Sequence, residues 1–374
     1  MITSLGRFAA LLGTVTACGE PQRPPAAPPP VVVAAPAAED LTAAVEAVRA
    51  AEKLPAVGVA IWKHGTLVAK GVSGVRAAGD PTPVTFDDQW HLGSDTKAMT
   101  AALIGIYVDR GVLHWTDTLA TLFSGETIDP GYANVTLDQV LQHRSGAPGK
   151  PPDALWAALW RNAPDARIAF VRGILAQPPA QAPGTFVYSN AGYMIAGAAL
   201  ERATKQTWET LIARDLFAPL HMRSCGFGAP GTATAVDQPR GHTADGTAVP
   251  PGPKADNPPA LGPAGTVHCS LADWGAFLSF EAAPATPLVT AATRTHLHTP
   301  PPDGNPDQAY MGGWLIVRLT PGDTRYIHEG SNTMWHAIGL VVPALDMAVA
   351  VVANQDDNNL LTAIAPVVSP FLKR

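Results

Sequence analysis

Strand-like segments lie at both ends of this chain and enclose a long stretch with helical patterns. Near the start, residues 56–62 and 66–71 are apolar runs of strand length, and Lys63-His64-Gly65 between them predicts a hairpin. Strand patterns and one last helix recur near the end, at residues 313–319, 325–328, 335–342, 347–353 and from about Asn358. This distribution predicts an α/β fold in which both chain ends build one antiparallel sheet, flanked by helices, with a mostly helical lobe inserted.

The segment between the two groups of strands is rich in helical periodicity. Its expected helices, and the one that precedes the hairpin, cover residues 41–53, 98–108, 137–142, 153–160, 168–176, 191–203 and 208–216. We therefore divide the folded region, residues 40–374, into an α/β part of about 40–93 and 264–374 and a helical lobe of about 94–263. With 374 residues, the chain is long enough for a substantial core.

The first residues have the features of an export signal. Arg7 supplies positive charge, a short apolar run follows and small residues precede Cys18, so we interpret residues 1–17 as a signal peptide. This pattern resembles the lipobox of bacterial lipoproteins, which implies lipidation of Cys18 and a membrane anchor. An ordinary cleaved signal that contains a cysteine is the alternative. By the same resemblance, Gly19 favours the outer membrane, with the protein facing the periplasm. Residues 18–39, rich in proline and alanine, would form a semi-rigid linker.

Composition excludes nucleic acid as a partner and leaves a cysteine pair open to two interpretations. The formal net charge is −6 and only 15% of the residues are charged, which gives no electrostatic footprint for nucleic acid. Besides Cys18, the chain contains Cys225 and Cys269. Disulfides persist in exported proteins, so these two cysteines are candidates for a bridge. Two buried thiols that act as small apolar side chains are the alternative.

Ser94-Asp95-Thr96-Lys97 places a hydroxyl and an amine one helical turn apart. Gly93 allows a tight turn before this segment, and the apolar face of a helix follows it. A serine hydroxyl is a poor nucleophile until a neighbouring base activates it. Lys97 can be that base if burial or nearby positive charge lowers its pKa. Asp95 fills a variable position and would favour the helix dipole from the first turn.

A serine–lysine pair also needs a proton relay to the leaving group and donors for the oxyanion. Tyr188-Ser189-Asn190 offers a phenol for the relay and an amide that can bind a substrate carbonyl, at an exposed junction before a helix. His328-Glu329-Gly330 ends an expected strand of the C-terminal group. Its glycine would let a substrate lie along the strand edge, and the next backbone N–H, that of Ser331, would face the oxyanion.

Two other segments match the same short patterns. Tyr132-Ala133-Asn134 also reads Tyr-x-Asn, and His91-Leu92-Gly93 also reads His-x-Gly. Chain order and context exclude both, because a His-x-Gly before the serine cannot belong to the late strand and Tyr132 leads into a helix. Three pairs remain in this chain order: Ser94/Lys97, Tyr188/Asn190 and His328/Gly330. Together they are far more specific than any one pair alone.

This combination resembles the serine β-lactamase-like, penicillin-recognising hydrolases, in the branch of class C β-lactamases, D,D-peptidases and related esterases. The resemblance covers the chain from about Leu41 to its end and includes Gln142-His143-Arg144-Ser145-Gly146 and Gly262-Pro263-Ala264-Gly265-Thr266. It implies a β-lactamase/transpeptidase-like fold and acyl-enzyme chemistry without a metal or cofactor. Position by position, it implies Ser94 as acylated nucleophile, Lys97 as its activating partner, Tyr188 as general acid and base, Asn190 and His328 as substrate-orienting residues, and the N–H groups of Ser94 and Ser331 as the oxyanion hole.

Glu329 departs from the family pattern, in which the middle residue of the strand motif is usually Thr or Ser. His328 also stands where many members have Lys. A carboxylate near the substrate would repel the carboxylate of a β-lactam or a D-Ala-D-Ala peptide by about 1–4 kcal/mol at about 4 Å. We therefore expect poor recognition of these anionic substrates and no such penalty for neutral esters or amides. Alternation along the strand could instead direct Glu329 away from the cleft.

The predicted function is that of a serine hydrolase that forms a Ser94 acyl-enzyme with a neutral ester or amide. A β-lactamase, a D,D-carboxypeptidase or a D-aminopeptidase is the alternative within this chemistry. A non-catalytic cell-wall-binding lipoprotein is the alternative of another class. Such a protein would have no need to keep Ser94, Lys97 and Tyr188 together.

Several histidines and tryptophans have simpler interpretations than a functional site. His296-Leu297-His298 has metal-ligand spacing but is expected to be a solvated segment without a metal. His143 is expected to be a hydrogen-bonded structural histidine. Trp156 and Trp160, one helical turn apart, are typical of core packing, although a tryptophan near the cleft would suit an acyl pocket.

Overall fold

The computed structural model describes residues 37–161, 163–301, 305 and 308–373. The expected signal peptide, Cys18 and the linker up to residue 36 lie outside these described residues. Residues Ala38–Arg374 form one compact unit. Within the described part, no helix combines the length and apolar character that a membrane span requires.

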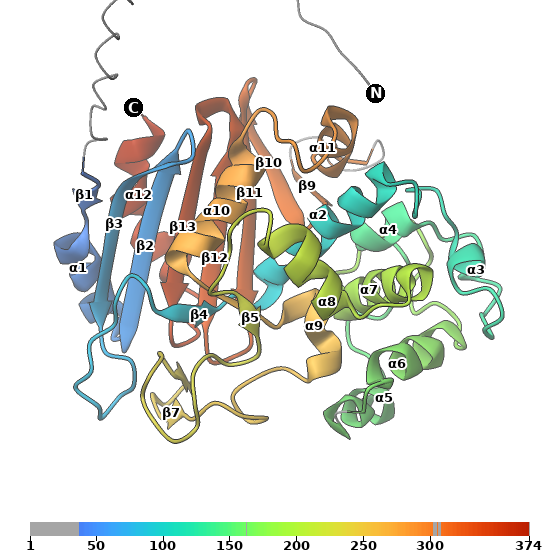
Figure 1. Cartoon of the computed structure of the whole chain (residues 1–374), viewed down its shortest axis with the longest axis horizontal. Coiled ribbons are helices and arrows are strands. Elements are labelled where there is room, and N and C mark those ends of the chain that lie inside the picture. The colour runs from blue at the N-terminus through green and yellow to red at the C-terminus, as the bar shows by residue number, and fades with distance from the viewer. Residues whose placement is uncertain (1–36, 162, 302–304, 306–307, 374) are drawn as a thin grey trace, which may run out of the picture. The chain divides into compact units, whose positions relative to one another are not determined.

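Both chain ends contribute to one eight-stranded sheet in the described residues (Figure 1). In spatial order its strands are β1 (Glu39–Asp40), β3 (Thr66–Gly74), β2 (Ala56–Lys63), β13 (Met347–Ala353), β12 (His336–Val342), β11 (Asp323–Ser331), β10 (Trp314–Thr320) and β9 (Gln308–Met311). The last strand of the chain, β13, lies between β2 and β12 and is antiparallel to both. The remaining pairs are antiparallel too, except that β1 joins β3 in parallel. The antiparallel sheet that the sequence predicts from both chain ends is therefore present.

The helices lie on both faces of the sheet and in the segment between its two halves (Figure 1). They are α1 (Thr42–Glu52), α2 (Thr96–Asp109), α3 (Leu119–Leu122), α4 (Leu137–Leu141), α5 (Asp153–Ala158), α6 (Ala166–Leu175), α7 (Asn190–Thr204), α8 (Trp208–Ile212), α9 (Gly262–Gly265), α10 (Leu271–Ala282), α11 (Ala291–Leu297) and α12 (Leu360–Leu372). α1 and α12 cover one face, and α10 crosses the other. α2 packs against α7, α9 and α11, while the turn before it contacts β11 and β12. The start of α2 thus lies between the sheet and the helical lobe.

The central strands read as unbroken apolar runs because both of their faces are covered. In β2, Val57 and Val59 belong to the core shared with α1 and α12, whereas Ala60 and Trp62 belong to the core shared with α10. Strand side chains alternate between faces, so one continuous run serves two cores. α10 was not among the expected helices, although Ser270 caps it by accepting from the Asp273 N–H, a Ser-x-x-Asp start before an apolar run.

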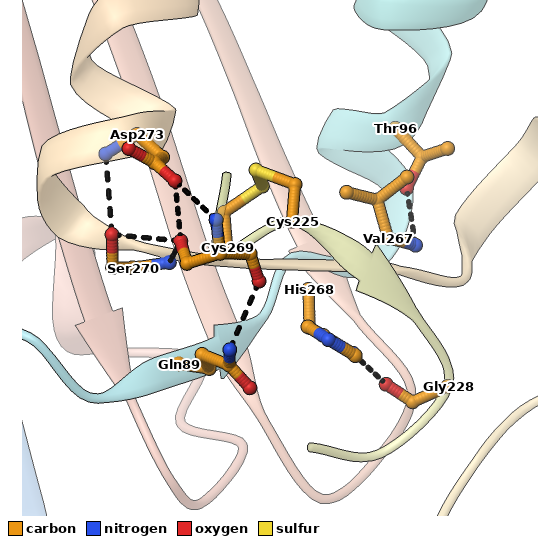
Figure 2. The surroundings of a disulfide bond; sticks show 10 residues. Gln89, Thr96, Cys225, Gly228, Val267, His268, Cys269, Ser270 and Asp273 are labelled. Carbon is orange, nitrogen blue, oxygen red and sulfur yellow. Dashed lines mark hydrogen bonds between the residues drawn. A yellow bond between two sulfur atoms is a disulfide. The ribbon is translucent and has the colours of Figure 1, made fainter. Parts of the chain in front are cut away.

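Cys225 and Cys269 form a disulfide, which decides between the two interpretations of this pair (Figure 2). The bridge joins the residue before β5 (Gly226–Phe227) to β8 (Val267–Ser270), and β8 also pairs with β4 (Gln89–His91). Hydrogen bonds surround it, among them Ser224 Oγ to Asp273 Oδ2 at 2.6 Å. The closed segment spans 44 positions and includes the small β6–β7 sheet, Gly241–His242 with Ala248–Val249.

Candidate active site

Ser94 lies in a single 3₁₀ turn, Gly93–Asp95, between β4 and α2. Gly93 has a φ of +49°, and a Cβ there would lie 2.4 Å from the Ser331 nitrogen, so the position requires glycine. The Gly93 N–H donates to His91 Nδ1 at 3.1 Å, which fixes the turn from the β4 side. The tight turn expected before the serine is therefore present, and Ser94 is half-buried within it.

Lys97 is fully buried behind Ser94, and its Nζ lies 2.9 Å from Ser94 Oγ. The same nitrogen donates to the carbonyl oxygen of Ala264, in α9, at 2.7 Å. Burial lowers the pKa of Lys97 well below its ordinary value, and the nearby Asp95 carboxyl opposes this shift only in part. An amine that is neutral at this position can accept the Ser94 proton.

Tyr188 lies on the loop before α7 with its hydroxyl hydrogen-bonded to Ser94. Lys97 Nζ lies 4.8 Å from the centre of its ring. Loss of water around the hydroxyl raises the pKa of Tyr188, and the hydrogen bond with Ser94 only partly offsets this rise. The phenol therefore stays protonated at neutral pH. The loop is held by Ser189, whose N–H donates to His143 Nδ1 at 3.1 Å, in keeping with a structural role for His143.

The backbone of β11 closes the site from the sheet side. A Cβ on Gly330 would lie 2.0 Å from the Leu92 carbonyl oxygen and 2.8 Å from the Ser94 nitrogen. Gly93 makes the matching close approach to the Ser331 nitrogen, so the amide groups of Ser94 and Ser331 lie at one contact between turn and strand. β10 pairs with β11 only as far as Ile327, so the residues of β11 after Ile327 extend beyond the part that pairs with β10. This geometry suits two N–H donors that stabilise an oxyanion.

His328 is buried in β11 and carries no positive charge. Its Nδ1 lies 2.8 Å from the Glu329 carbonyl oxygen, and its Nε2 lies 3.0 Å from the Tyr310 hydroxyl. A carbonyl oxygen can only accept, so Nδ1 carries the hydrogen and Nε2 accepts from Tyr310. Burial, with a further contribution from Lys97, lowers the pKa of His328 to about 3. The strand motif therefore presents a neutral hydrogen-bonding group.

Glu329 points to the opposite face of the sheet from His328. It lies across from Ile338, which belongs to the core of α1 and α12, and cross-strand partners share a face. His328 lies across from Gly339, where an added Cβ would meet α10. The Glu329 side chain is 46% exposed and ion-pairs with His336 at 3.1 Å. It therefore does not exert the repulsion expected from the sequence, and the alternative orientation is the one present.

Asn190 occupies the first position of α7 and has an unused hydrogen-bonding group. Its Oδ1 is buried and has no hydrogen-bond partner among the described residues. An unpaired buried amide oxygen costs about 1–3 kcal/mol. A substrate group that donates a hydrogen bond would remove this cost, in line with the substrate-binding role expected for Asn190.

These elements occur together in a known family. A sequence model of the Beta-lactamase family matches residues 41–367. The chain belongs to the β-lactamase family. The β-lactamase/transpeptidase-like architecture is likewise confirmed, because the octameric penicillin-binding protein homologue from Pyrococcus abyssi superimposes with a TM-score of 0.73 at 22% identity, over 89% of this chain and 76% of that chain.

Two relatives in the β-lactamase family show how far sequence similarity extends. Unguisins hydrolase ungD of Aspergillus violaceofuscus is 25% identical over 350 residues, which cover 81% of this chain and 58% of ungD. Penicillin-binding protein 4 of Amycolatopsis lactamdurans is 27% identical over 324 residues, 83% of each protein. This chain thus spans just over half the length of ungD. The β-lactamase family as a whole consists of serine hydrolases, including esterases, amidases, D-peptidases and β-lactamases.

One residue of the nucleophile turn in this β-lactamase family member is more deeply buried than the sequence suggested. Asp95 lies directly before α2, at the helix start as expected, but its side chain makes no capping hydrogen bond there. Its carboxyl is fully buried in a slot between two strands, where a Cβ on Gly330 or Gly339 would lie 2.7–2.8 Å from its oxygens. Burial raises the pKa of Asp95 well above its ordinary value. Facing glycines on adjacent strands were the signal for this slot.

The two spaced histidines each pair with a carboxylate, and the expectation of a solvated segment is wrong for His298, which is largely buried. His296 Nε2 lies 2.8 Å from Asp138 Oδ1. His298 Nε2 lies 2.7 Å from Glu281 Oε2, and only 9% of its side chain is exposed. Among the described residues, no group of three or more histidine, cysteine, aspartate or glutamate side chains is arranged to hold a metal ion.

Proposed function

We propose that this protein hydrolyses neutral esters or amides through an acyl-enzyme at Ser94. The observation that carries the proposal is the 2.9 Å contact between Ser94 Oγ and the buried Nζ of Lys97. Burial lowers the pKa of that amine and so favours its neutral form, which can act as a base for the serine proton. A non-catalytic lipoprotein would gain nothing from a desolvated lysine, because a buried amine without a counter-charge is costly.

The proposed reaction begins when Ser94 Oγ attacks the substrate carbonyl carbon and its proton passes to Lys97 Nζ. The Ser94 and Ser331 N–H groups bind the oxyanion that forms. As the tetrahedral intermediate collapses, the bond to the leaving group breaks, Tyr188 gives that group its proton, and the proton held by Lys97 replaces it. Water then attacks the acyl-enzyme, loses its proton to Lys97 and releases the acid, while Ser94 regains its hydrogen.

The charge state of His328 supports a preference for substrates without a carboxylate. A lysine at that position would meet a substrate carboxylate with about 1–4 kcal/mol of attraction at about 4 Å. His328 provides no such attraction, because it is neutral and already hydrogen-bonded to Tyr310. The sequence also predicts a preference for neutral substrates, but it attributes that preference to Glu329, whereas we attribute it to His328.

A side-by-side assay tests this proposal. Nitrocefin, p-nitrophenyl acetate, p-nitrophenyl butyrate and D-alanyl peptides are compared, with Ser94→Ala as the control for background hydrolysis. We expect the neutral esters to give the highest kcat/KM, together with fluorophosphonate labelling that Ser94→Ala abolishes. Preferential turnover of nitrocefin or of D-alanyl peptides would instead identify a β-lactamase, a D,D-carboxypeptidase or a D-aminopeptidase. An unlabelled protein without turnover would favour the cell-wall-binding alternative.

Replacing His328 provides the sharper test of substrate charge. We expect His328→Lys to raise kcat/KM for nitrocefin relative to p-nitrophenyl butyrate about tenfold, the equivalent of about 1.4 kcal/mol. His328→Gln is the matched control, since it keeps a neutral hydrogen-bonding group and should leave that ratio within about twofold. An unchanged ratio in a folded His328→Lys protein would remove the electrostatic basis of the proposal.

We also propose that the protein is exported and anchored through a lipid on Cys18. The support is the apolar run and the small residues before that cysteine. Metabolic labelling with palmitate should mark the wild-type protein and not Cys18→Ser. Recovery of an unlabelled wild-type protein from the periplasmic fraction would point to an ordinary cleaved signal instead.

A further inference from the structure

In the described part of the chain, the end of β11 that carries the second oxyanion donor pairs with a strand on one side only. β10 reaches only as far as Ile327, so residues 329–331 pair with β12 alone. Gly330, in the middle of these three residues, has no side chain that could anchor the segment. The position of the Ser331 N–H therefore depends on what holds the side chains of Glu329 and Ser331.

Both of these side chains belong to one cluster on the α1 and α12 face of the sheet. Glu329 lies on that face, and Ser331, two residues later in the strand, lies on the same one. His336 in β12 is the cross-strand partner of Ser331. Its Nε2 lies 3.1 Å from Glu329 Oε2, and its Nδ1 lies 3.2 Å from Asp356 Oδ1, in the segment between β13 and α12. The ring thus lies between two carboxylates.

Asp356 connects His336 to Ser331. The hydrogen bond from His336 lowers the pKa of Asp356, so the carboxylate is ionised at neutral pH, and it is also hydrogen-bonded to the Ser331 side chain. A carboxylate can only accept, so the Ser331 hydroxyl donates to Asp356, while its oxygen accepts the Thr333 N–H at 2.8 Å. Ser331 is therefore fixed by its side chain as well as by its pairing with β12.

The charge on His336 stabilises this cluster. Burial disfavours the charged ring, but hydrogen bonds to Asp356 and Glu329 outweigh this effect and raise the pKa of His336 to about 9. At neutral pH, each ring nitrogen therefore donates to one carboxylate. When Nδ1 loses its proton, it no longer donates to Asp356 and can instead accept the Asp357 N–H, 3.4 Å away. The two carboxylates are then left without the cation between them and repel each other.

Two further carboxyl groups face His336. Asp357 follows Asp356 in the segment before α12, and Asp95 interacts with the charge of the ring from the turn that carries the nucleophile. The Asp95 carboxyl is fully buried, and burial raises its pKa well above the ordinary value. Titration of Asp95 would persist in a variant that lacks His336, so such a variant separates the effects of the two groups.

The catalytic groups would not cause a loss of activity near pH 9. Loss of a proton from Lys97 would raise activity, because the neutral amine is the base. Burial raises the pKa of Tyr188 well above its ordinary value of about 10, so the phenol keeps its proton in this range. A fall in kcat near pH 9 would therefore point to the cluster behind the oxyanion strand.

We propose that His336 and Asp356 position the Ser331 N–H in the oxyanion hole, so that His336 controls catalysis without touching the substrate. This inference rests on the proposed function, because it concerns the same acyl-enzyme reaction. With the ring charged, Glu329 and Ser331 are held on both sides of Gly330, where β11 meets the nucleophile turn. With the ring neutral, the end of the strand loosens and the donor loses its alignment. Stabilisation of the transition state then falls, with little effect on substrate binding.

The pH dependence of kcat for p-nitrophenyl butyrate tests this inference. Fluorophosphonate labelling of Ser94 gives the concentration of active protein, and Ser94→Ala gives the background hydrolysis. We expect wild-type kcat to fall about five- to tenfold between pH 8 and pH 10.5 with KM nearly unchanged, because a loosened oxyanion donor should cost less than the roughly 100-fold effect of a lost one. His336→Gln should have the lower kcat already at pH 7.5 and show no such fall.

His298→Gln is the matched control for the loss of a histidine. His298 is a similarly buried histidine that pairs with a carboxylate, Glu281 at 2.7 Å, outside the catalytic machinery. This variant should keep both the wild-type kcat at pH 7.5 and the wild-type fall at high pH.

Asp356→Asn separates positioning from a general loss of structure. The variant keeps an oxygen that can accept from Ser331 but removes one anion beside His336, so the ring should lose its proton about one pH unit lower. The midpoint of the fall in kcat should move down with it. A purely structural role would change the amount of protein that can be labelled and would leave this midpoint unchanged.

A spectroscopic measurement covers the case in which neither variant folds. Wild-type protein with ¹³C-labelled histidine should show one ring that titrates near pH 9, with the same midpoint as kcat. No such ring, a wild-type kcat that stays level to pH 10.5, or an undiminished fall in His336→Gln would overturn the inference while ester hydrolysis upholds the proposed function. Failure of ester hydrolysis, together with failure of Ser94 labelling, would overturn the proposed function itself.

Discussion

Lys97 Nζ has two oxygen neighbours, Ser94 Oγ at 2.9 Å and the Ala264 carbonyl at 2.7 Å. Among the described residues it forms no ion pair with a carboxylate, and the nearby Asp95 carboxyl is itself buried. A cation in this setting would lack a counter-charge and most of its hydration, which disfavours protonation. A lysine is therefore converted into a base by its surroundings.

The Lys97 amine must be neutral to accept a proton, so acylation requires a pH above the Lys97 pKa. Because burial moves that pKa well below its ordinary value, activity should already be high at neutral pH. Lys97→Arg cannot lose its proton and should lower kcat/KM for p-nitrophenyl butyrate at least 1000-fold between pH 6 and 9. Lys150→Arg, at an exposed position, is the control. A Lys97→Arg protein that retains a tenth of the activity would contradict this role.

The sequence predicts residues of the site well where their relation is local. Ser94 lies in the turn that leads into α2, three positions before Lys97, and that spacing brings Oγ and Nζ together. The direction of Glu329 could not be read in the same way, because it depends on which face of β11 is turned toward α10. The burial of Asp95 was missed for a similar reason, since its slot exists only when β11 and β12 are side by side.

At the scale of elements, the site depends on how closely β11 approaches the turn before α2. Two glycines make this approach possible, Gly93 in the turn and Gly330 in the strand. At each of these glycines, the backbone of the other segment lies so close that a Cβ atom would not fit. The oxyanion donors are therefore positioned by a contact between backbones.

Gly330→Ala should separate the two backbones, because its Cβ would lie 2.0 Å from the Leu92 carbonyl oxygen. We expect kcat to fall about 100- to 1000-fold, the typical effect of losing an oxyanion donor. Gly192→Ala in α7 is a suitable comparison, since its Cβ would meet nothing closer than 3.5 Å. The two variants are compared by p-nitrophenyl butyrate hydrolysis and by circular dichroism. Full activity in folded Gly330→Ala would show that the strand does not position the donors.

His336 links three segments on the other face of the sheet. Its Nε2 lies 3.1 Å from Glu329 in β11, and its Nδ1 lies 3.2 Å from Asp356, beyond β13. Burial disfavours the charged ring, but hydrogen bonds to Asp356 and Glu329 outweigh this and raise the pKa of His336 to about 9. The folded state therefore holds a proton that the unfolded chain releases at a lower pH.

Loss of this proton lowers the free energy of unfolding as the pH rises. The contribution is complete below about 6.5, the pKa of an unperturbed histidine, and is lost as the pH passes about 9. Because Glu329 is 46% exposed, solvent screening limits the loss to about 1–2 kcal/mol. Urea unfolding at pH 6 and pH 9.5 measures it, and His336→Gln should remove most of the difference. An equal difference in the variant would assign it to other groups.

For the whole molecule, the sequence predicts the strands of the sheet better than the helices that cover it. The strand runs at both ends were identified because β2 and β13 are buried on two faces and so lack polar interruptions. α10 was missed although its cap was visible, because its residues are apolar on nearly every side and show little helical periodicity. Strand order, with β13 inserted between β2 and β12, depends on long-range pairing that no local pattern encodes.

The Cys225–Cys269 bridge acts on the stability of the whole domain. It closes a loop of 44 positions, which in the chain-entropy treatment contributes about 4 kcal/mol by restricting the unfolded chain. We expect Cys225→Ala/Cys269→Ala to lower the free energy of unfolding by about 2–4 kcal/mol in urea titrations. Wild-type protein in dithiothreitol is the parallel sample, and the variant should not respond to the reductant. No loss of stability in either would mean that the bridge adds nothing to the fold.

The insertion of β13 between β2 and β12 affects when the active site is completed during folding. The nucleophile and its base belong to the first third of the chain, whereas the second oxyanion donor, Ser331, belongs to the last eighth. β11 can take its place only after β12 and β13 have bridged the gap to β2. A chain still under synthesis therefore holds a serine and a lysine without the strand that would make them reactive. Catalysis begins as one of the last events of folding, and such late long-range pairing is slow.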